Sequence, residues 1–287
     1  MAEGFPEDYE VDRAIFVDEV GLEIGIYGQY RLKTSYQPIF RREGSNLVPF
    51  ALEARVAPYR EGQQTTATEF FDVVPSADRR FVEAVCRTLH LRNHRNLGAD
   101  DAASLQLYLT VDPRLEMQGQ NSGLLASITR LAEESDLSPG MITCEILDAP
   151  TLSTKALAAT VDALRDYGVR VSIAEFRVGK SAIDRIMRIE PDVIKIDGAW
   201  FRNVQDSAET AVLFPAVITA FQGLGANLLV QGIETPFELD AALKSNADYL
   251  QGVLLARPAL VGTIVDDRPR PIAYFTEQDR KIMPTRT

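Results

Sequence analysis

The feature of this sequence that most limits its fold is a repeated alternation of short, β-branched apolar runs with amphipathic helical segments. Several runs are nearly continuous in apolar residues, which is typical of strands covered on both faces. The alternation predicts a parallel sheet or barrel, and the number of runs favours a closed α/β barrel. The eight predicted strands are 36–40, 50–56, 105–111, 142–147, 169–176, 193–196, 227–231 and 249–253.

Local signals predict where several helices begin and end. The segment 153–167 carries an apolar stripe at helical spacing, and Gly168 follows as a stop signal. The run Thr235-Pro236-Phe237-Glu238 has the pattern of a capping box with proline at the first helical position. A helix that opens at Ser207 is expected to be kinked or delayed by Pro215.

Composition excludes several functional classes. The chain has 30 Lys and Arg against 41 Asp and Glu, a net charge of −11, which disfavours nucleic-acid polymers and anionic lipid as partners. Two cysteines, Cys86 and Cys144, form neither a disulfide framework nor a metal-like motif. With no apparent signal peptide or membrane segment, the sequence predicts a cytoplasmic protein.

The flanks of the barrel differ from its middle. We expect an N-terminal helical extension over 1–30, which either docks on the barrel or forms a partner-binding arm. The barrel domain is expected over 31–262, and a loosely ordered tail over 263–287. His90 and His94 lie four residues apart on a predicted helix, and a solvated helix face is the favoured interpretation over a zinc site.

Polar residues cluster where the predicted strands end, and in such barrels the chemistry lies at the carboxyl ends of the strands. Unpaired carboxylates are costly inside strands, so acids that converge there indicate a cation site or catalytic acids. For Asp112 and Asp148, capping of the following helix is an equally good interpretation. The full set is Glu53, Thr110, Asp112, Glu145, Asp148, Glu175, Lys195, Asp197, Gln231, Glu234 and Gln251.

Five strings in this order resemble the EAL domain: FALEARV (50–56), CEILD (144–148), IKID (194–197), QGIET (231–235) and YLQGVLLARP (249–258). This family comprises bacterial phosphodiesterases that open cyclic di-GMP to linear pGpG. The resemblance implies a TIM-like (β/α)8 barrel with one antiparallel strand. It also implies a catalytic mechanism in which two Mg²⁺ or Mn²⁺ ions activate water and stabilise phosphodiester charge.

The resemblance assigns roles to individual positions. It implies that Glu53, Glu145, Lys195 and Asp197 are catalytic, or remnants of a catalytic set. Glu234 and Gln251 match ligand-binding positions of the family. The metal-ligating candidates are Glu53, Glu145 and Glu175, although Glu175 is one methylene longer than the aspartate it replaces. That difference moves its carboxylate by ~1 Å, beyond the ~0.2 Å tolerance of metal ligands.

Four further positions depart from the family pattern. Thr110 replaces an asparagine, Ala174 a metal-bridging aspartate and Gln231 a glutamate. Ala57 replaces the arginine that holds phosphate in the family, which removes a bidentate contact. These positions are degenerate, so the expected metal site is weak or absent.

Two arginines enter the same region. Arg55 shares a strand face with Glu53 and replaces an aliphatic residue, while Arg177 replaces a glycine of the active-site loop. We hypothesise that an arginine–carboxylate network takes the place of the metals, with both arginines available to bind ligand. The alternative for Arg55 is a side chain that extends out to the rim.

The sequence therefore favours a degenerate, catalytically inactive EAL-domain protein. We expect a signalling or scaffold module that works through protein partners, with weak, metal-independent binding of cyclic di-GMP and no required cofactor. The alternative is an active phosphodiesterase with a remodelled Mg²⁺ or Mn²⁺ site. A homodimer is compatible with either hypothesis, and the chain could belong to a longer sensor.

Overall fold

The protein is built on a closed sheet of eight strands. The computed structural model describes residues 8–94, 96–97, 105–116, 122–147, 154–176, 180–263 and 266–276. Around the barrel the strand order is β3-β11-β10-β9-β8-β7-β6-β4, and pairing of β3 with β4 closes it. The strands are β3 (Tyr30–Glu43), β4 (Asn46–Arg60), β6 (Gln106–Val111), β7 (Ile142–Leu147), β8 (Arg170–Phe176), β9 (Val193–Ile196), β10 (Asn227–Val230) and β11 (Tyr249–Leu250).

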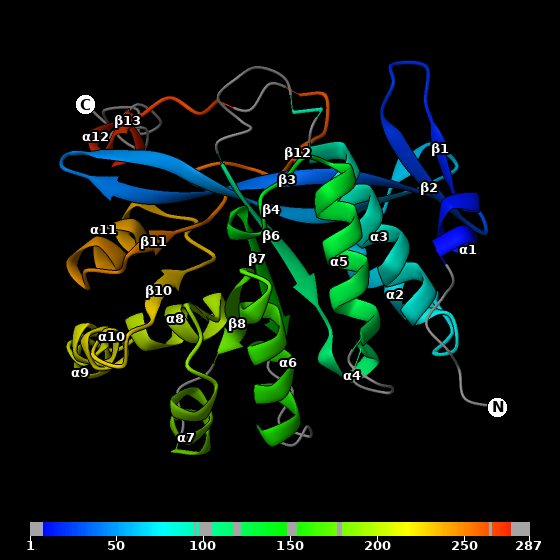
Figure 1. Cartoon of the computed structure of the whole chain (residues 1–287). Helices are drawn as coiled ribbons and strands as arrows, with labels where there is room; N and C mark the ends of the chain where they lie inside the picture. Colours follow the sequence, from blue (N-terminus) through cyan, green and yellow to red (C-terminus); the bar gives the residue numbers. More distant parts are fainter. Residues whose placement is uncertain are drawn as a thin grey trace, which may run out of the picture.

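The predicted barrel with one reversed strand is confirmed. From β4 through β11 each neighbouring pair is parallel, whereas β3 is antiparallel to both β4 and β11. All eight predicted strands are present. The largest difference is in β3 and β4, which extend far beyond the barrel as a long two-stranded ribbon (Figure 1).

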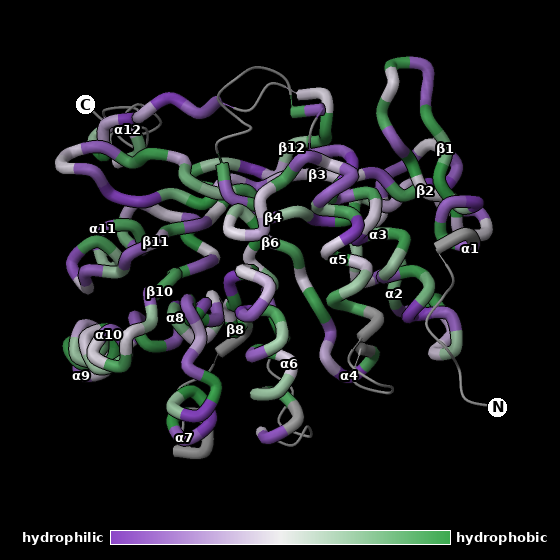
Figure 2. The backbone as a smooth tube through the Cα atoms, viewed as in Figure 1, coloured by the Kyte–Doolittle hydropathy of each residue, from purple (hydrophilic) through white to green (hydrophobic). Residues whose placement is uncertain are grey.

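Helices cover the outside of the sheet (Figure 1). Green apolar and purple polar stretches alternate along several of them, as expected where one helix face meets the strands (Figure 2). They are α2 (Ala67–Val73), α3 (Arg79–His94), α4 (Pro113–Glu116), α5 (Ser122–Glu134), α6 (Thr154–Asp166), α7 (Lys180–Ile189), α8 (Gly198–Gln205), α9 (Ala208–Ala211), α10 (Phe214–Gln222) and α11 (Pro236–Lys244), with a 3-10 turn at Pro139–Met141.

The local helix signals act as expected. The Thr235 hydroxyl accepts the backbone N–H of Glu238, whose carboxylate in turn accepts that of Thr235, so the capping box is confirmed. The helix from Ser207 is interrupted, and Pro215 lies in the first turn of α10, because proline can start a helix but cannot continue one. Helix α6 matches the predicted 153–167 segment.

Apolar side chains fill the barrel on both sides of its strands. A large outer cluster packs the strands against the surrounding helices. A smaller cluster lies inside the barrel and consists of Ile39, Phe50, Ala51, Tyr108, Val193 and Leu229. We call this cluster the inner plug. It fills the barrel nearer the amino ends of the parallel strands, so the polar side chains described below lie between it and their carboxyl ends.

The N-terminal segment is only partly helical. Helix α1 (Asp8–Arg13) is followed by strands β1 (Ile15–Val17) and β2 (Glu23–Tyr27), which extend the sheet from β3. The apolar residues that suggested a longer helix alternate along these strands instead. Of these residues, Ile15 packs against a second small core that Val11 and Leu32 form with residues of α2 and α3, whereas Phe16 is exposed.

The C-terminal tail is more ordered than the sequence suggested. Strand β13 (Arg270–Pro271) pairs with β4, and helix α12 (Ile272–Thr276) buries Phe275. The Phe275 ring lies edge-on to Phe40, with centroids 6.4 Å apart. Two short strands complete the sheet: β5 (Gln63–Gln64) beside β4, and β12 (Ala259–Leu260) beside β3.

The expectation of a solvated histidine face was wrong. His90 and His94 are both buried, because α3 lies between the barrel and the N-terminal strands and has no fully open face. His90 Nδ1 lies 3.0 Å from Thr34 Oγ1. Burial lowers the pKa of His90 to about 3 and that of His94 to about 4, so both rings are neutral at physiological pH.

None of the helices within the described part of the chain combines the length and apolar character needed to cross a bilayer.

Gly252, which follows β11, has no space for a side chain. A Cβ atom at this position would lie 1.9 Å from the carbonyl oxygen of Ile233, a backbone atom that cannot move aside. We therefore expect Gly252→Ala to lower the free energy of unfolding by more than ~4 kcal/mol or to prevent folding. Gly140→Ala is the matched control, because a Cβ there meets nothing within 4 Å. Urea unfolding of both variants tests this, and equal stabilities would contradict it.

Candidate functional site

Four polar side chains from separate strands meet above the inner plug. Glu53 lies on β4, Glu145 on β7 and Lys195 on β9, while Gln251 directly follows β11. Alternate residues of a strand face the same side. Each of the four therefore points into the barrel two residues after an inward-facing residue of the layer below: Ala51, Thr143, Val193 or Tyr249. All four side chains are buried.

The ammonium of Lys195 lies between the two carboxylates. Its Nζ is 3.0 Å from Glu53 Oε2 and 2.8 Å from Glu145 Oε2. Only 1% of the Lys195 side chain is exposed, so this charge depends on the two glutamates for its stabilisation. We call Glu53, Glu145, Lys195, Arg55 and Gln251 the pocket network.

Glu53 Oε2 receives two more donors. Arg55 Nη2 lies 3.0 Å away, and Gln251 Nε2 donates at 2.5 Å. One carboxylate oxygen thus accepts hydrogen bonds from Arg55 and Gln251 and forms an ion pair with Lys195. This oxygen is saturated by the protein itself.

The charges of the pocket network shift one another's protonation. Burial alone raises the pKa of Glu53, but the charges of Lys195 and Arg55 outweigh it and lower that pKa to about 2. Burial also raises the pKa of Glu145, and Lys195 offsets this only in part. Burial would lower the pKa of Lys195, yet the two carboxylates raise it. The ammonium therefore stays charged, with Glu53 as its ionised partner.

The sequence offered two interpretations of Arg55, a contact with the carboxylates and a side chain that extends to the rim, and the structure shows features of both. Its guanidinium contacts Glu53, as the hypothesis of an arginine–carboxylate contact requires, but 44% of its side chain is exposed at the rim. Arg177 lies outside the described residues, so the network rests on Lys195 and Arg55. The principal counter-ion in the buried layer is the lysine.

Divalent cations of the kind that the family resemblance implies do not fit this donor set. Hard cations bind about six oxygens each, whereas Glu53 and Glu145 are the two carboxylates here, and both already contact an ammonium. Within the described residues, no group of three acidic, histidine or cysteine side chains could hold a metal ion.

The other predicted site residues lie around this layer. Asp197 follows β9 and caps α8, where its carboxylate accepts the N–H of Trp200 at 2.7 Å. Glu234 is exposed at the rim, with its carboxylate 3.3 Å from the Arg202 guanidinium. Asp112 accepts the N–H of Arg114, which agrees with the helix-capping interpretation.

The degenerate positions occupy the strand ends. Ala57 and Ala174 are buried, Gln231 is partly buried, and Thr110 is exposed at the end of β6. The backbone of Glu175 belongs to β8, but its side chain is not described, and Asp148 lies outside the described residues.

Sequence reasoning missed Gln37. This buried residue of β3 lies directly opposite Glu53 in the β3–β4 ladder. Its Nε2 donates to the carbonyl of Ala256 at 3.0 Å and so ties the segment after β11 to the mouth of the barrel. The signal was available, because the parity of the predicted strand 36–40 places Gln37 on the face of Ile39.

Fold and pocket together define an α/β barrel with a charge-compensated pocket at the carboxyl ends of its strands. The EAL domain model matches residues 25–258, and the chain belongs to the EAL domain family.

Curated relatives carry the same domain within longer proteins. A probable cyclic di-GMP phosphodiesterase of Escherichia coli K12, PdeA, is 25% identical over 132 residues, which are 46% of this chain and 18% of that protein. The cyclic di-GMP phosphodiesterase NbdA of Pseudomonas aeruginosa is 25% identical over 173 residues, or 60% of this chain and 21% of the relative. The aligned part of the chain thus spans about a fifth of each relative.

Solved structures share the fold. The PaMucR phosphodiesterase in complex with c-di-GMP has a TM-score of 0.69 at 20% identity, covering 80% of this chain and 92% of that one. Klebsiella pneumoniae BlrP1 with calcium and cyclic di-GMP has a TM-score of 0.70 at 19% identity, covering 81% and 57%.

Removing the Lys195 ammonium leaves two carboxylates buried side by side. We expect Lys195→Met to lower the free energy of unfolding by about 3–5 kcal/mol at pH 7. The loss should shrink toward pH 4, because protonation of the glutamates relieves their repulsion. Lys244→Met, at an exposed surface pair with Asp240, is the control and should change stability by less than ~0.5 kcal/mol. A Lys195→Met loss as small as that of the control would contradict the assignment.

The lowered pKa of Glu53 gives the pocket a defined pH dependence. Because its pKa is about 2 in the folded protein against 4.5 ordinarily, ionised Glu53 stabilises the fold above pH 4.5. This contribution is lost as the pH falls from 4.5 through 2. The stability difference between the native protein and Glu53→Gln should therefore narrow over this range in urea unfolding. A difference that stays constant from pH 6 to pH 2.5 would show that Glu53 is not held ionised.

Proposed function

We propose that this protein is a catalytically inactive EAL-domain module of cyclic di-GMP signalling, which acts through protein partners and binds the dinucleotide weakly without metal. The observation that carries the proposal is the occupation of Glu53 Oε2 by Lys195 together with Arg55, a cation that replaces an aliphatic residue of the family pattern. The protein's own cation thus occupies the centre of the charge pattern.

Electrostatics favour this arrangement over a loaded metal site. When both glutamates are ionised, the two negative charges of Glu53 and Glu145 balance the positive charges of Lys195 and Arg55. A divalent ion about 4 Å from the ammonium would be repelled by roughly 8 kcal/mol at an effective dielectric constant of 20. Metal binding would require Lys195 to leave, and its buried position offers no solvated alternative.

The missing side chains support inactivity independently. A two-metal mechanism needs ligands that stabilise both the attacking and the leaving oxygen. Ala174, Gln231 and Thr110 offer no carboxylate at the three positions where the family provides metal ligands. Loss of one electrostatic element commonly costs a factor of ~10²–10³ in rate, so several together leave negligible turnover.

Exposed apolar residues support a role in protein recognition. Phe16, Val17 and Val20 are 51–77% exposed on the β1–β2 hairpin, and β1 is the edge strand of the sheet. An unpaired strand edge with apolar side chains favours association with another chain. Whether that chain is a different protein or a second copy stays a prediction.

The alternative function is an active phosphodiesterase with a remodelled site. The retained pair Glu53 and Glu145 favours it, as do the names of relatives that hydrolyse cyclic di-GMP. In that case Lys195 would have to rotate away and expose both carboxylates to a metal.

Calorimetry and product analysis separate the two functions. We expect no saturable heat from Mn²⁺ or Mg²⁺ at pH 7.5 up to millimolar concentration, and no linear pGpG by chromatography after incubation with cyclic di-GMP and Mn²⁺. Arg55→Leu should raise Mn²⁺ affinity above that of the native protein, because it removes one competing charge from Glu53. Turnover that is lost in Glu53→Gln would establish the alternative.

A further inference from the structure

The long β3–β4 ribbon extends beyond the barrel from the strand position that holds Glu53. Strand β4 pairs with β6 only at Ala51–Glu53, but its pairing with β3 continues to Arg60. Residues after Glu53 therefore rise past the carboxyl end of the barrel, at the mouth of the pocket (Figure 1). One face of this ribbon is covered by α3, where Leu32 and Tyr36 are buried.

The other ribbon face is cationic. Residues directly opposite each other in an antiparallel ladder share a face, and the pairs Ser35–Arg55, Lys33–Ala57 and Arg31–Tyr59 follow Gln37–Glu53 in order. Arg55, Lys33 and Arg31 thus occupy successive rungs of the face that bears Glu53, roughly 7 Å apart. We call Arg31, Lys33, Arg55 and Tyr59 the cationic strip.

The cationic strip has little compensation from acids. Among the described residues, no carboxylate oxygen lies within 4.0 Å of the Lys33 or Arg31 side-chain nitrogens. The Lys33 ammonium instead lies 5.2 Å from the centre of the Tyr59 ring, and this contact holds it in place. In a chain of net charge −11, such a row of cations marks a place for an anion.

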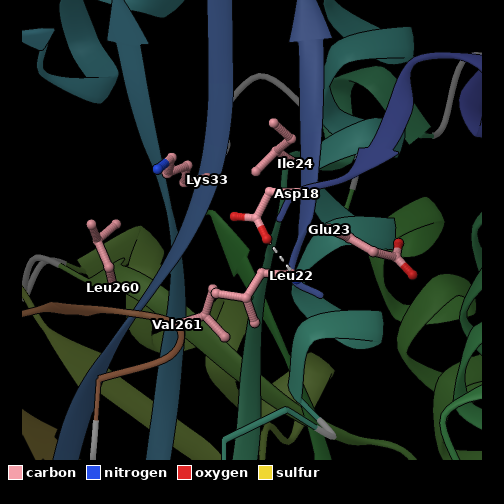
Figure 3. Close-up of a pocket in the computed structure, with 7 residues that line it drawn as sticks. All are labelled: Asp18, Leu22, Glu23, Ile24, Lys33, Leu260 and Val261. Carbon is pink, nitrogen blue, oxygen red and sulfur yellow. Dashed lines mark hydrogen bonds between the residues drawn. The ribbon is translucent and has the colours of Figure 1, made fainter. Parts of the chain in front are cut away.

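The surface beside Lys33 is hollowed (Figure 3). A small notch with a cavity volume of about 40 Å³ lies between β2 and β12, with apolar walls from Leu22, Ile24, Leu260 and Val261. Figure 3 shows the Lys33 ammonium turned away from Asp18, which with Glu23 is one of the two carboxylates that line the notch. Asp18 Oδ1 is itself occupied by the N–H groups of Val20 and Leu22.

From this geometry we infer that the cationic strip binds the phosphate groups of a small nucleotide, with Lys33 as the principal contact. Lys33 stands across the ladder from Ala57, which is uncharged and buried, so the half-buried Lys33 side chain is the part of this pair that can meet a phosphate at the surface. Arg55 bridges the strip and the pocket network, since one of its nitrogens contacts Glu53 while much of the side chain stays exposed. The inference deepens the nucleotide binding proposed above and rests on it for the choice of ligand.

Binding isotherms with the full chain test the strip in EDTA, where metal-dependent turnover cannot occur. The probe is cyclic di-GMP. We expect Lys33→Ala to weaken its binding about tenfold, the loss of one charge-assisted contact, and Lys33→Arg to retain most of the affinity. Arg42→Ala is the matched control, because it removes an exposed cation from the opposite end of the same strand and should leave binding unchanged. Binding should also weaken with salt.

Each contrary outcome has a distinct meaning. No binding by the native protein, or equal affinity in Lys33→Ala and native protein, overturns the strip. If inorganic phosphate displaces cyclic di-GMP at an equal concentration, the cationic strip recognises phosphate alone, which would contradict a nucleotide ligand. None of these results bears on catalytic inactivity, which the separate assay for linear product decides.

Discussion

One buried ammonium between two carboxylates controls the site of this protein. An isolated charge costs several kcal/mol to bury, so Lys195, Glu53 and Glu145 can share the interior only as a group. The three residues lie on β9, β4 and β7, which are separated from one another by β8 and β6. The ion pairs therefore cross the barrel interior and fix strands that no backbone ladder joins directly.

The same contacts determine what the pocket can do. Among the structures of similar fold, PaMucR is named a phosphodiesterase and is bound to c-di-GMP, and BlrP1 is bound to calcium and cyclic di-GMP. Here Glu53 Oε2 and Glu145 Oε2 already contact N–H donors, and Ala174 and Thr110 stand where the family resemblance implies metal ligands. The exposed positive charges lie farther out, on Arg55 and on the ribbon residues Lys33 and Arg31. A buried cluster of compensated charges with exposed cations beside it is the arrangement on which the proposed metal-independent binding depends.

Much of the barrel could be predicted from the sequence because its signals are local. Apolar runs and the Thr235 capping box predicted elements that the structure contains, and strand parity brought Glu53, Glu145 and Lys195 to one end of the barrel. The remaining features depend on tertiary contacts. Whether Arg55 or Lys195 would be the main partner of the carboxylates depends on which side chain is buried. Likewise, the burial of His90 and the docking of Phe275 depend on which surfaces meet, and neither leaves a periodic pattern.

The most direct test is a crystal structure determined from crystals soaked in manganese at neutral pH, with anomalous scattering used to locate the metal. We expect no anomalous peak between Glu53 and Glu145, with the Lys195 nitrogen still in contact with both carboxylates. A well-occupied manganese ion between them, with Lys195 displaced, would contradict it.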